Sequence, residues 1–473
     1  MKRLTRLACI ALAVVPIAAV AACSSGSSSS PSPSSTAAAA TSSSTGSVST
    51  ASSTVPQLSP NQKVSITFES YNLSQAGPWA DTFQKLIAGF EKQYPNITVT
   101  LQKPSLGGTV TNAINSLYQE SAAGNPPDVA QEVFSAQNFI VNDLKADDLD
   151  SVVGTSAVQG NFGGTYPFAS TAKTLGNDNG QTYGVPFVFS TPVLYYNATL
   201  FKEAGLNPAT PPTTWAQVKT DALAIKNKTG KDGAYIDCLT KDSGDWCWQA
   251  LVDSEGGSVL SSNGSKLTFG DAPAVQAATM AQGLVDSGAM PKLTQLQAYP
   301  DFAAGKVGMI LESSSLQGTF QKGAAAGNWQ LADAEMPSFN GKPTAPTNSG
   351  AALFMLAKTP ATERASWDLI TYLTSPQAYT QISENIGYLP LRTGLVSAPT
   401  GLLAWAKAHP LLQANLDQLN RLEPWQSFPG TNWNQIISDM MDAVQAVVFQ
   451  NGNPSSTLSA AQQTASSLLP SSQ

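Results

Sequence analysis

The strongest constraint on the fold lies in residues 63–102, where a strand pattern, a helix pattern and a second strand pattern follow one another. "KVSITFES" alternates apolar and polar residues, with Val64, Ile66 and Phe68 on one face. Pro78 begins a helix with an apolar face, Pro95 ends it, and "NITVTL" alternates again. This spacing predicts a βαβ unit with a parallel strand pair and a right-handed crossover.

A helix at about 109–123 and a short strand at 129–133 continue the pattern, which predicts an open α/β sheet. In such sheets, ligands bind beyond the carboxyl ends of the strands. Tyr71 and Glu132 stand at two of these ends and are therefore candidates for ligand contact.

Further along the chain, capping residues mark several more helices. Thr213 or Thr214 begins one that ends at Gly230, and Thr362 caps another that runs through Leu373. The remaining expected elements are a helix at 273–286, a strand in "GKVGMILESSS", a helix at 375–387 and a last long helix at 433–449.

The N-terminus carries an export signal. Lys2, Arg3 and Arg6 precede an apolar run at 7–22, which is too short for a membrane span, so residues 1–22 are predicted to be a signal peptide. The small residues in "VAAC" resemble a bacterial lipobox, so Cys23 is expected to be the lipidated N-terminus, anchoring an extracytoplasmic protein to the cell membrane. A plain signal peptide with an incidental cysteine is the alternative.

Residues 23–60 are nearly all Ser, Thr, Ala, Gly and Pro, a composition that predicts a disordered tether. About 410 residues remain, enough for two lobes with substantial cores. Their charge is acidic, with 32 Asp and Glu against 25 Lys and Arg in the whole chain, and no basic run is present. This composition argues against nucleic-acid binding.

The cysteines and the single histidine limit which disulfide, metal site or catalytic triad the chain can form. Once Cys9 and Cys23 are assigned to export, Cys238 and Cys247 remain and are expected to form a disulfide, with two free thiols as the alternative. His409 is the only histidine, which disfavours a Ser-His-Asp triad and a zinc cluster. We therefore expect no metal, no cofactor and no enzyme activity. An exported carbohydrate-active enzyme using paired carboxylates is the remote alternative.

Six motifs stand in a familiar order between residues 63 and 450: "FEKQYPNITV", "AAGNPPDVA", "GVPF…TPVLYYNATLFKEAGL", "PPTTW", "GKVGMILE" and "ENIGYLPLR". The chain thereby resembles family 1 extracellular solute-binding proteins, which are capture subunits of ABC importers for sugars and glycerol phosphates. It looks closest to the glycerol-3-phosphate-binding branch. The resemblance implies a small-molecule solute, docking on the permease transmembrane subunits, and a monomer.

The resemblance also implies the two-lobe periplasmic-binding-protein fold, in which two α/β lobes are joined by chain crossings at the floor of a ligand cleft. The expected N-lobe comprises 61–187 with 306–346, and the expected C-lobe comprises 188–305 with 347–466. Ser190 lies on the first crossing and is expected to face ligand, or else to satisfy neighbouring backbone groups. Its hydroxyl neighbour Thr191 is expected to face the same gap.

Other positions are expected at the cleft because they match the family. Ser315 or Ser313 corresponds to a serine that contacts ligand, and Tyr388 and Arg392 match residues that line the cleft. Arg392 has an alternative role, pinning the helix that ends at Gly387. Gly350 lets backbone approach closely.

Tryptophans supply candidate stacking faces for sugar rings or a choline group. Trp246 and Trp248 flank Cys247, and because residues alternate on a strand, only one of them is expected to face ligand. Trp433 belongs to a second tryptophan-rich edge. Gln435 stands where the phosphate-binding branch has an arginine, so a neutral carbohydrate is the preferred solute. Glycerol-3-phosphate or a glycerophosphodiester is the alternative.

Overall fold

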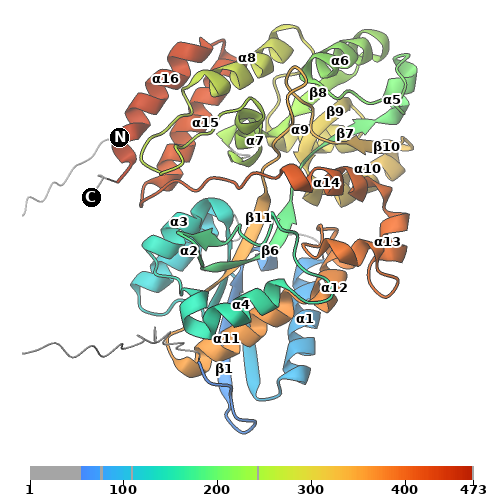
Figure 1. Cartoon of the computed structure of the whole chain (residues 1–473). Coiled ribbons are helices and arrows are strands. Elements are labelled where there is room, and N and C mark those ends of the chain that lie inside the picture. The colour runs from blue at the N-terminus through green and yellow to red at the C-terminus, as the bar shows by residue number, and fades with distance from the viewer. Residues whose placement is uncertain (1–54, 75–77, 108–109, 242–243, 471–473) are drawn as a thin grey trace, which may run out of the picture. The chain divides into compact units, whose positions relative to one another are not determined.

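The computed structural model describes residues 55–74, 78–107, 110–241 and 244–470, which contain two main β-sheets (Figure 1). The signal segment, Cys23 and the tether up to residue 54 lie outside the described residues. No helix in the described ranges is long and apolar enough to cross a membrane.

The first sheet contains the predicted βαβ unit and has the strand order β2-β1-β3-β11-β6. Strand β1 pairs in parallel with both β2 and β3, which confirms the predicted parallel arrangement. Strand β11 is antiparallel to β3 and to β6. The strands span Val64–Ser70 (β1), Ile97–Gln102 (β2), Val129–Val133 (β3), Gly184–Ser190 (β6) and Ser349–Met355 (β11).

The second sheet has the order β10-β7-β9-β8, with β8 parallel to β9 and β7 antiparallel to both β9 and β10. Its strands span Pro192–Asn197 (β7), Asp232–Ile236 (β8), Val307–Ser313 (β9) and Leu331–Ala334 (β10). A separate short hairpin joins Asn177–Asp178 (β4) and Gln181–Thr182 (β5).

Helices cover the first sheet because their apolar faces pack against it. Phe83 of α1 contacts Phe68 of β1 and Phe187 of β6, so one aromatic cluster joins the helix to two strands of the sheet. The helices on this side are Trp79–Gln93 (α1), Val110–Ala122 (α2), Gln137–Asn142 (α3), Thr155–Phe162 (α4), Pro360–Leu373 (α11) and Pro376–Ile386 (α12).

A second group of helices surrounds the other sheet (Figure 1). These helices span Ala198–Glu203 (α5), Trp215–Thr229 (α6), Trp246–Ser254 (α7), Ala272–Asp286 (α8), Gln295–Ala303 (α9), Gln317–Gly327 (α10), Gln413–Asp417 (α14), Trp433–Gln450 (α15) and Pro454–Ala465 (α16). The short helix Leu403–Ala408 (α13) lies between α12 and α14 in the chain.

The strand pairing differs from the expected division of the chain into lobes. Residues 306–346 were expected with the N-lobe, yet they contain β9 and β10, which pair with β7 in the second sheet. Residues 347–466 were expected with the C-lobe, yet they begin with β11, which lies between β3 and β6 in the first sheet. Hydrogen-bond partners of this kind are far apart in sequence, and a local pattern carries no information about them.

Smaller differences concern element ends. Thr359, rather than Thr362, accepts the capping hydrogen bond at the start of α11, because Pro360 is already helical. Helix α16 follows the helix that was expected to be last. The tether was expected to reach residue 60, but the backbone N–H of Val55 donates to Val152, and Leu58 packs against the core.

Cys238 and Cys247 form the expected disulfide, with Cα atoms 5.5 Å apart. Cys238 follows β8, and Cys247 is the second residue of α7, so the bond fixes the start of this helix against the end of a strand. Both residues are fully buried.

Replacing both cysteines with serine should lower the free energy of unfolding by about 2.5 kcal/mol, because the bond closes a small loop in the unfolded chain. Urea denaturation of the variant and the oxidised wild type measures the difference. Equal midpoints would show that the bond adds no stability.

Candidate functional site

The chain passes directly from the first sheet to the second at residues 190–192. Ser190 ends β6 beside Ser349 of β11, and Pro192 begins β7 beside Ser313 of β9. The Ser190 and Ser313 hydroxyl oxygens lie 2.7 Å apart, and those of Ser313 and Ser315 lie 2.8 Å apart. A row of three hydroxyl groups therefore leads from the crossing outward.

Thr191, the residue between the two strands, faces α14 instead of joining this row. Its hydroxyl donates to Asn415 Oδ1 at 2.5 Å and accepts from Gln418 Nε2 at 2.6 Å. Gln418 Nε2 also donates to the carbonyl oxygen of Pro192. These bonds hold the crossing against the C-terminal part of the chain.

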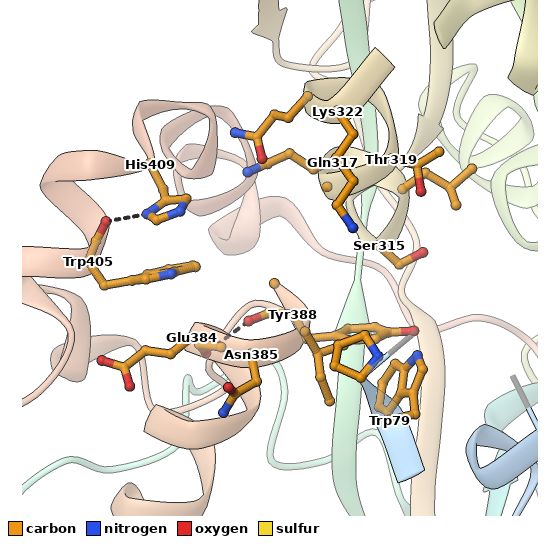
Figure 2. A pocket seen from close by; sticks show the side chains of 17 residues that line it. Trp79, Ser315, Gln317, Thr319, Lys322, Glu384, Asn385, Tyr388, Trp405 and His409 are labelled. Atoms are coloured by element: carbon orange, nitrogen blue, oxygen red, sulfur yellow. Dashed lines mark hydrogen bonds between the residues drawn. The ribbon is translucent and has the colours of Figure 1, made fainter. Parts of the chain in front are cut away.

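A cavity of about 390 Å³ lies at the outer end of the hydroxyl row (Figure 2). Two predicted site residues, Ser315 and Tyr388, line it. Its other walls come from α1, α10, the end of α12 and α13, so residues far apart in sequence converge here. They are Pro78, Trp79, Leu316, Gln317, Gly318, Thr319, Gln321, Lys322, Ser383, Glu384, Asn385, Ile386, Gly387, Trp405 and His409.

Tyr388 is the aromatic residue on the inner wall of the cavity. Its ring packs edge-on against Trp79, with centroids 5.2 Å apart. Burial raises the pKa of the Tyr388 phenol to about 12, while a hydrogen bond with Ser315 acts in the opposite direction. The neutral hydroxyl can therefore donate or accept a hydrogen bond at neutral pH.

Behind Tyr388 lie the two candidates from the carboxyl ends of the first sheet. Tyr71 and Glu132 are both buried, and Tyr71 is close enough to Tyr388 and Glu132 to be affected by their charge. Burial, followed by repulsion from Glu69, raises the pKa of Glu132 well above its ordinary value. Glu132 Oε2 has no hydrogen-bond partner in the described part of the chain, and such a buried acceptor calls for an explanation.

The second sheet carries a comparable group, made of Glu312, which the sequence offers as a possible carboxylate, and Asp237, which the sequence reasoning missed. Burial, followed by repulsion from Asp237, raises the pKa of Glu312 at the end of β9. Gln295 Nε2 donates to Asp237 Oδ2 at 3.2 Å and to the Tyr299 hydroxyl at 2.7 Å. Asp237 directly follows β8. The rule that ligands bind beyond the carboxyl ends of strands, which selected Tyr71 and Glu132, therefore applies to Asp237 as well.

Trp246 and Trp248 lie on a helix, so strand alternation does not apply to them. Helix α7 begins at Trp246, and both side chains are buried. Trp433 is buried at the start of α15. None of these three tryptophans is among the described residues that line the cavity.

Gly350 is required by the approach of two strands. Its φ is 117°, and a Cβ at this position would lie 2.1 Å from the carbonyl oxygen of Val188 in β6. A side chain would therefore force β6 and β11 apart at the edge that faces the crossing.

Arg392 is buried and forms hydrogen bonds with backbone carbonyl groups. Its guanidinium donates to Thr374, Asn161, Gly163 and Tyr166, at distances between 2.6 and 3.0 Å, and lies 4.5 Å from the centre of the Phe168 ring. It therefore fastens the 161–168 segment to the end of α11, and it is not among the described residues that line the cavity.

Asp245 fastens another segment, 425–426, to the start of α7. It accepts hydrogen bonds from Gln249 Nε2 at 2.7 Å and from Trp425 Nε1 at 3.0 Å, while Gln249 Oε1 accepts from the backbone of Gln426. Burial raises the pKa of the fully buried Asp245 to about 6, although both hydrogen bonds act in the opposite direction.

This shift predicts a pH dependence of stability. Between the ordinary pKa of 3.8 and about 6, the folded state holds the Asp245 proton more tightly, so the free energy of unfolding falls as pH rises, by ~3 kcal/mol in total. Asp245→Asn should remove this part of the decline. Denaturation of both proteins from pH 4 to pH 7 measures it; parallel profiles would contradict the assignment.

No group of three or more His, Cys, Asp or Glu side chains in the described ranges is arranged to hold a metal ion. Two α/β lobes joined by a chain crossing, with a polar and aromatic cavity whose walls come from both groups of helices, form an architecture typical of ligand-binding proteins.

Comparisons with known proteins agree with this class. A family model described as bacterial extracellular solute-binding protein matches residues 85–414. A Deinococcus radiodurans protein named as an ABC transporter-binding protein is 25% identical over 325 residues, covering 66% of this chain and 73% of that protein. This chain belongs to the bacterial extracellular solute-binding proteins, an extracytoplasmic family of transport proteins, as its motifs predicted.

Two solved structures show the same two-lobe fold. The cyclic alpha-maltosyl-1,6-maltose binding protein of Arthrobacter globiformis has a TM-score of 0.73 at 21% identity, covering 86% of this chain and 99% of that one. UgpB of Mycobacterium tuberculosis, solved in complex with glycerophosphocholine, has a TM-score of 0.71 at 18% identity, covering 84% and 96%. The same fold thus occurs in a cyclic alpha-maltosyl-1,6-maltose binding protein and in a protein solved with glycerophosphocholine.

Proposed function

We propose that this chain captures a neutral carbohydrate and delivers it to the membrane subunits of an ABC importer. The observation that carries this proposal is the composition of the cavity wall. Hydroxyl, amide and aromatic groups suit the hydroxyls and apolar faces of a sugar. The likeness to the Arthrobacter globiformis protein supports the same ligand class.

The arginines support a neutral ligand over a phosphate. Phosphate recognition favours the two-pronged guanidinium group, and all three arginines in the described residues are engaged elsewhere. Arg364 pairs with Asp368, Arg421 pairs with Glu335, and Arg392 binds backbone carbonyls. Gln435, at the place of the expected phosphate-binding arginine, is exposed and donates to Asp439 on its own helix.

A glycerophosphodiester is the second candidate because of Lys322. This exposed lysine lines the cavity and forms no ion pair with any described residue. An ammonium group attracts a phosphodiester as a point charge, and the aromatic rings of the cavity suit a choline group. The likeness to a protein solved with glycerophosphocholine agrees with this alternative.

Capture occurs by closure of the two lobes around the solute. The cavity wall includes Trp79 of α1, which covers the first sheet, and Gln317 of α10, which belongs to the helices around the second sheet. A ligand between these two walls therefore contacts both lobes most fully when the lobes have closed. Such a ligand shifts the equilibrium toward the closed form, which then docks on the permease.

Ligand ranking tests the solute class. Neutral mono- and oligosaccharides should raise the melting temperature more than glycerol-3-phosphate or glycerophosphocholine does, with about 2.7 kcal/mol of stabilisation when the ligand is at a hundred times its Kd. Arg392→Met should lower the melting temperature and keep the same ranking. A shift with glycerol-3-phosphate alone, lost in Arg392→Met, would reverse the proposal.

The same samples address catalysis. As a binding protein, the chain should leave each stabilising glycan chemically unchanged after long incubation. A shortened glycan, detected by chromatography, would favour the carbohydrate-active enzyme.

Cys23 is proposed as the lipid attachment site, with the Ser- and Thr-rich segment holding the globule away from the membrane. Cys23→Ser should move the protein from the membrane fraction into the soluble extracytoplasmic fraction, because one residue carries the anchor. Detergent-phase partitioning measures the change, and unchanged partitioning would exclude Cys23.

A further inference from the structure

The cavity has a second aromatic wall that sequence reasoning missed. Trp405 and His409 of the α13 region line it, on a different wall from Tyr388 and Trp79 (Figure 2). We propose that Trp405 is the platform of an outer sugar subsite and that the ligand is therefore an oligosaccharide. This inference rests on the proposed carbohydrate function.

His409 holds the Trp405 ring in place. The two rings are stacked, with centroids 4.5 Å apart and planes inclined by 22°. His409 Nδ1 donates to the backbone carbonyl of Trp405 at 2.6 Å. One face of the half-buried indole is thereby covered, and the ring lines the cavity with part of its remaining surface. A platform ordered in advance loses little entropy when a sugar ring stacks on it.

Polar groups around the platform suit hydroxyl groups. Gln317 and Lys322 come from α10, and Glu384 and Asn385 come from the end of α12; all four line the same cavity. Figure 2 shows Trp405 between His409 and the Glu384–Asn385 end of α12. With Nδ1 bonded to the Trp405 carbonyl, Nε2 is the ring nitrogen left to form a hydrogen bond with a hydroxyl group. Hydrogen-bond donors and acceptors therefore line the cavity together with the Trp405 ring.

The two walls together set the length of the ligand. The inner wall offers Ser315 and Tyr388 next to the crossing, and the outer wall offers Trp405. One cavity of about 390 Å³ connects them, and this volume is within the ~300–1,000 Å³ typical of small-molecule sites. A monosaccharide on the inner wall leaves Trp405 without a partner, whereas a chain of linked sugars contacts both walls.

Length series of gluco-, xylo- and galacto-oligosaccharides, each starting from the monosaccharide, test the subsite by calorimetry on the purified protein. In wild type, affinity should rise with chain length in at least one series. Trp405→Ala should weaken binding of the longer members about three- to tenfold and leave the monosaccharide unchanged, because only the stacked outer unit is lost. Trp405→Phe should restore most of the affinity.

Lys407→Ala is the matched control, because Lys407 is exposed on the same helix and does not line the cavity; it should bind every glycan as wild type does. Equal affinity for monosaccharide and longer chains, or equal weakening of both in Trp405→Ala, overturns the outer subsite and leaves the carbohydrate function intact. Stabilisation by glycerophosphocholine with no glycan bound, or no binding in any series, overturns both.

Discussion

The arrangement of the whole molecule depends on the direct passage of the chain from β6 into β7. Only Thr191 stands between the two strands, so the two sheets meet at a single residue with little freedom to separate. Thr191 is held by Asn415 and Gln418, which come from the other end of the chain. Ser190, the last residue of β6, is consequently kept beside Ser313, the last residue of β9. The hydroxyl row therefore forms where the end of one sheet meets the end of the other.

Three carboxyl groups near the ends of β1, β3 and β9 are buried, which makes them difficult to ionise. Glu69 has its pKa raised to about 8, first by burial and then by Glu120, and its Oε2 accepts from Gln102 at 2.8 Å. Glu132 and Glu312 follow the same logic at the ends of β3 and β9. A raised pKa favours the neutral, protonated form of such a carboxyl group, which costs less to bury than a carboxylate. None of the three is among the described residues that line the cavity.

Local patterns predicted the elements of this fold well, because helix periodicity and capping are decided by nearby residues. Thr214 and Gly230 bound α6 as expected, and β1, α1 and β2 form the expected unit. Pairing across the sheets was not readable, so β9 and β11 were assigned to the wrong sheets. Trp246 was interpreted as part of a strand because a short apolar segment is compatible with either a strand or a helix. The structure shows that Trp246 begins helix α7.

The residues of the candidate site also fall into two groups, those that local patterns and motifs predict and those that depend on long-range packing. Ser315 and Tyr388, which line the cavity, could be predicted because family motifs and strand ends indicate where residues lie in the fold. Trp405 was missed because its role depends on the fold bringing α13 next to α10 and α12. His409, four residues further on, is consistent with an ordinary helix end until its stacking on Trp405 is seen.

The engagement of Arg392 within the fold bears on whether the chain can bind a phosphate group. A buried guanidinium is stable only when its donors are satisfied, and Arg392 obtains this from backbone carbonyls of two separate segments. Turning it toward a ligand would leave those carbonyls without a donor, so the fold opposes such a change. Among the described residues that line the cavity, Lys322 is the one Lys or Arg; it is exposed and hydrated, and it binds a phosphate less selectively than the two-pronged guanidinium of an arginine would. In the proposed carbohydrate complex, recognition therefore rests on neutral hydrogen bonds and aromatic faces, which distinguish sugars by the arrangement of their hydroxyls and by their length.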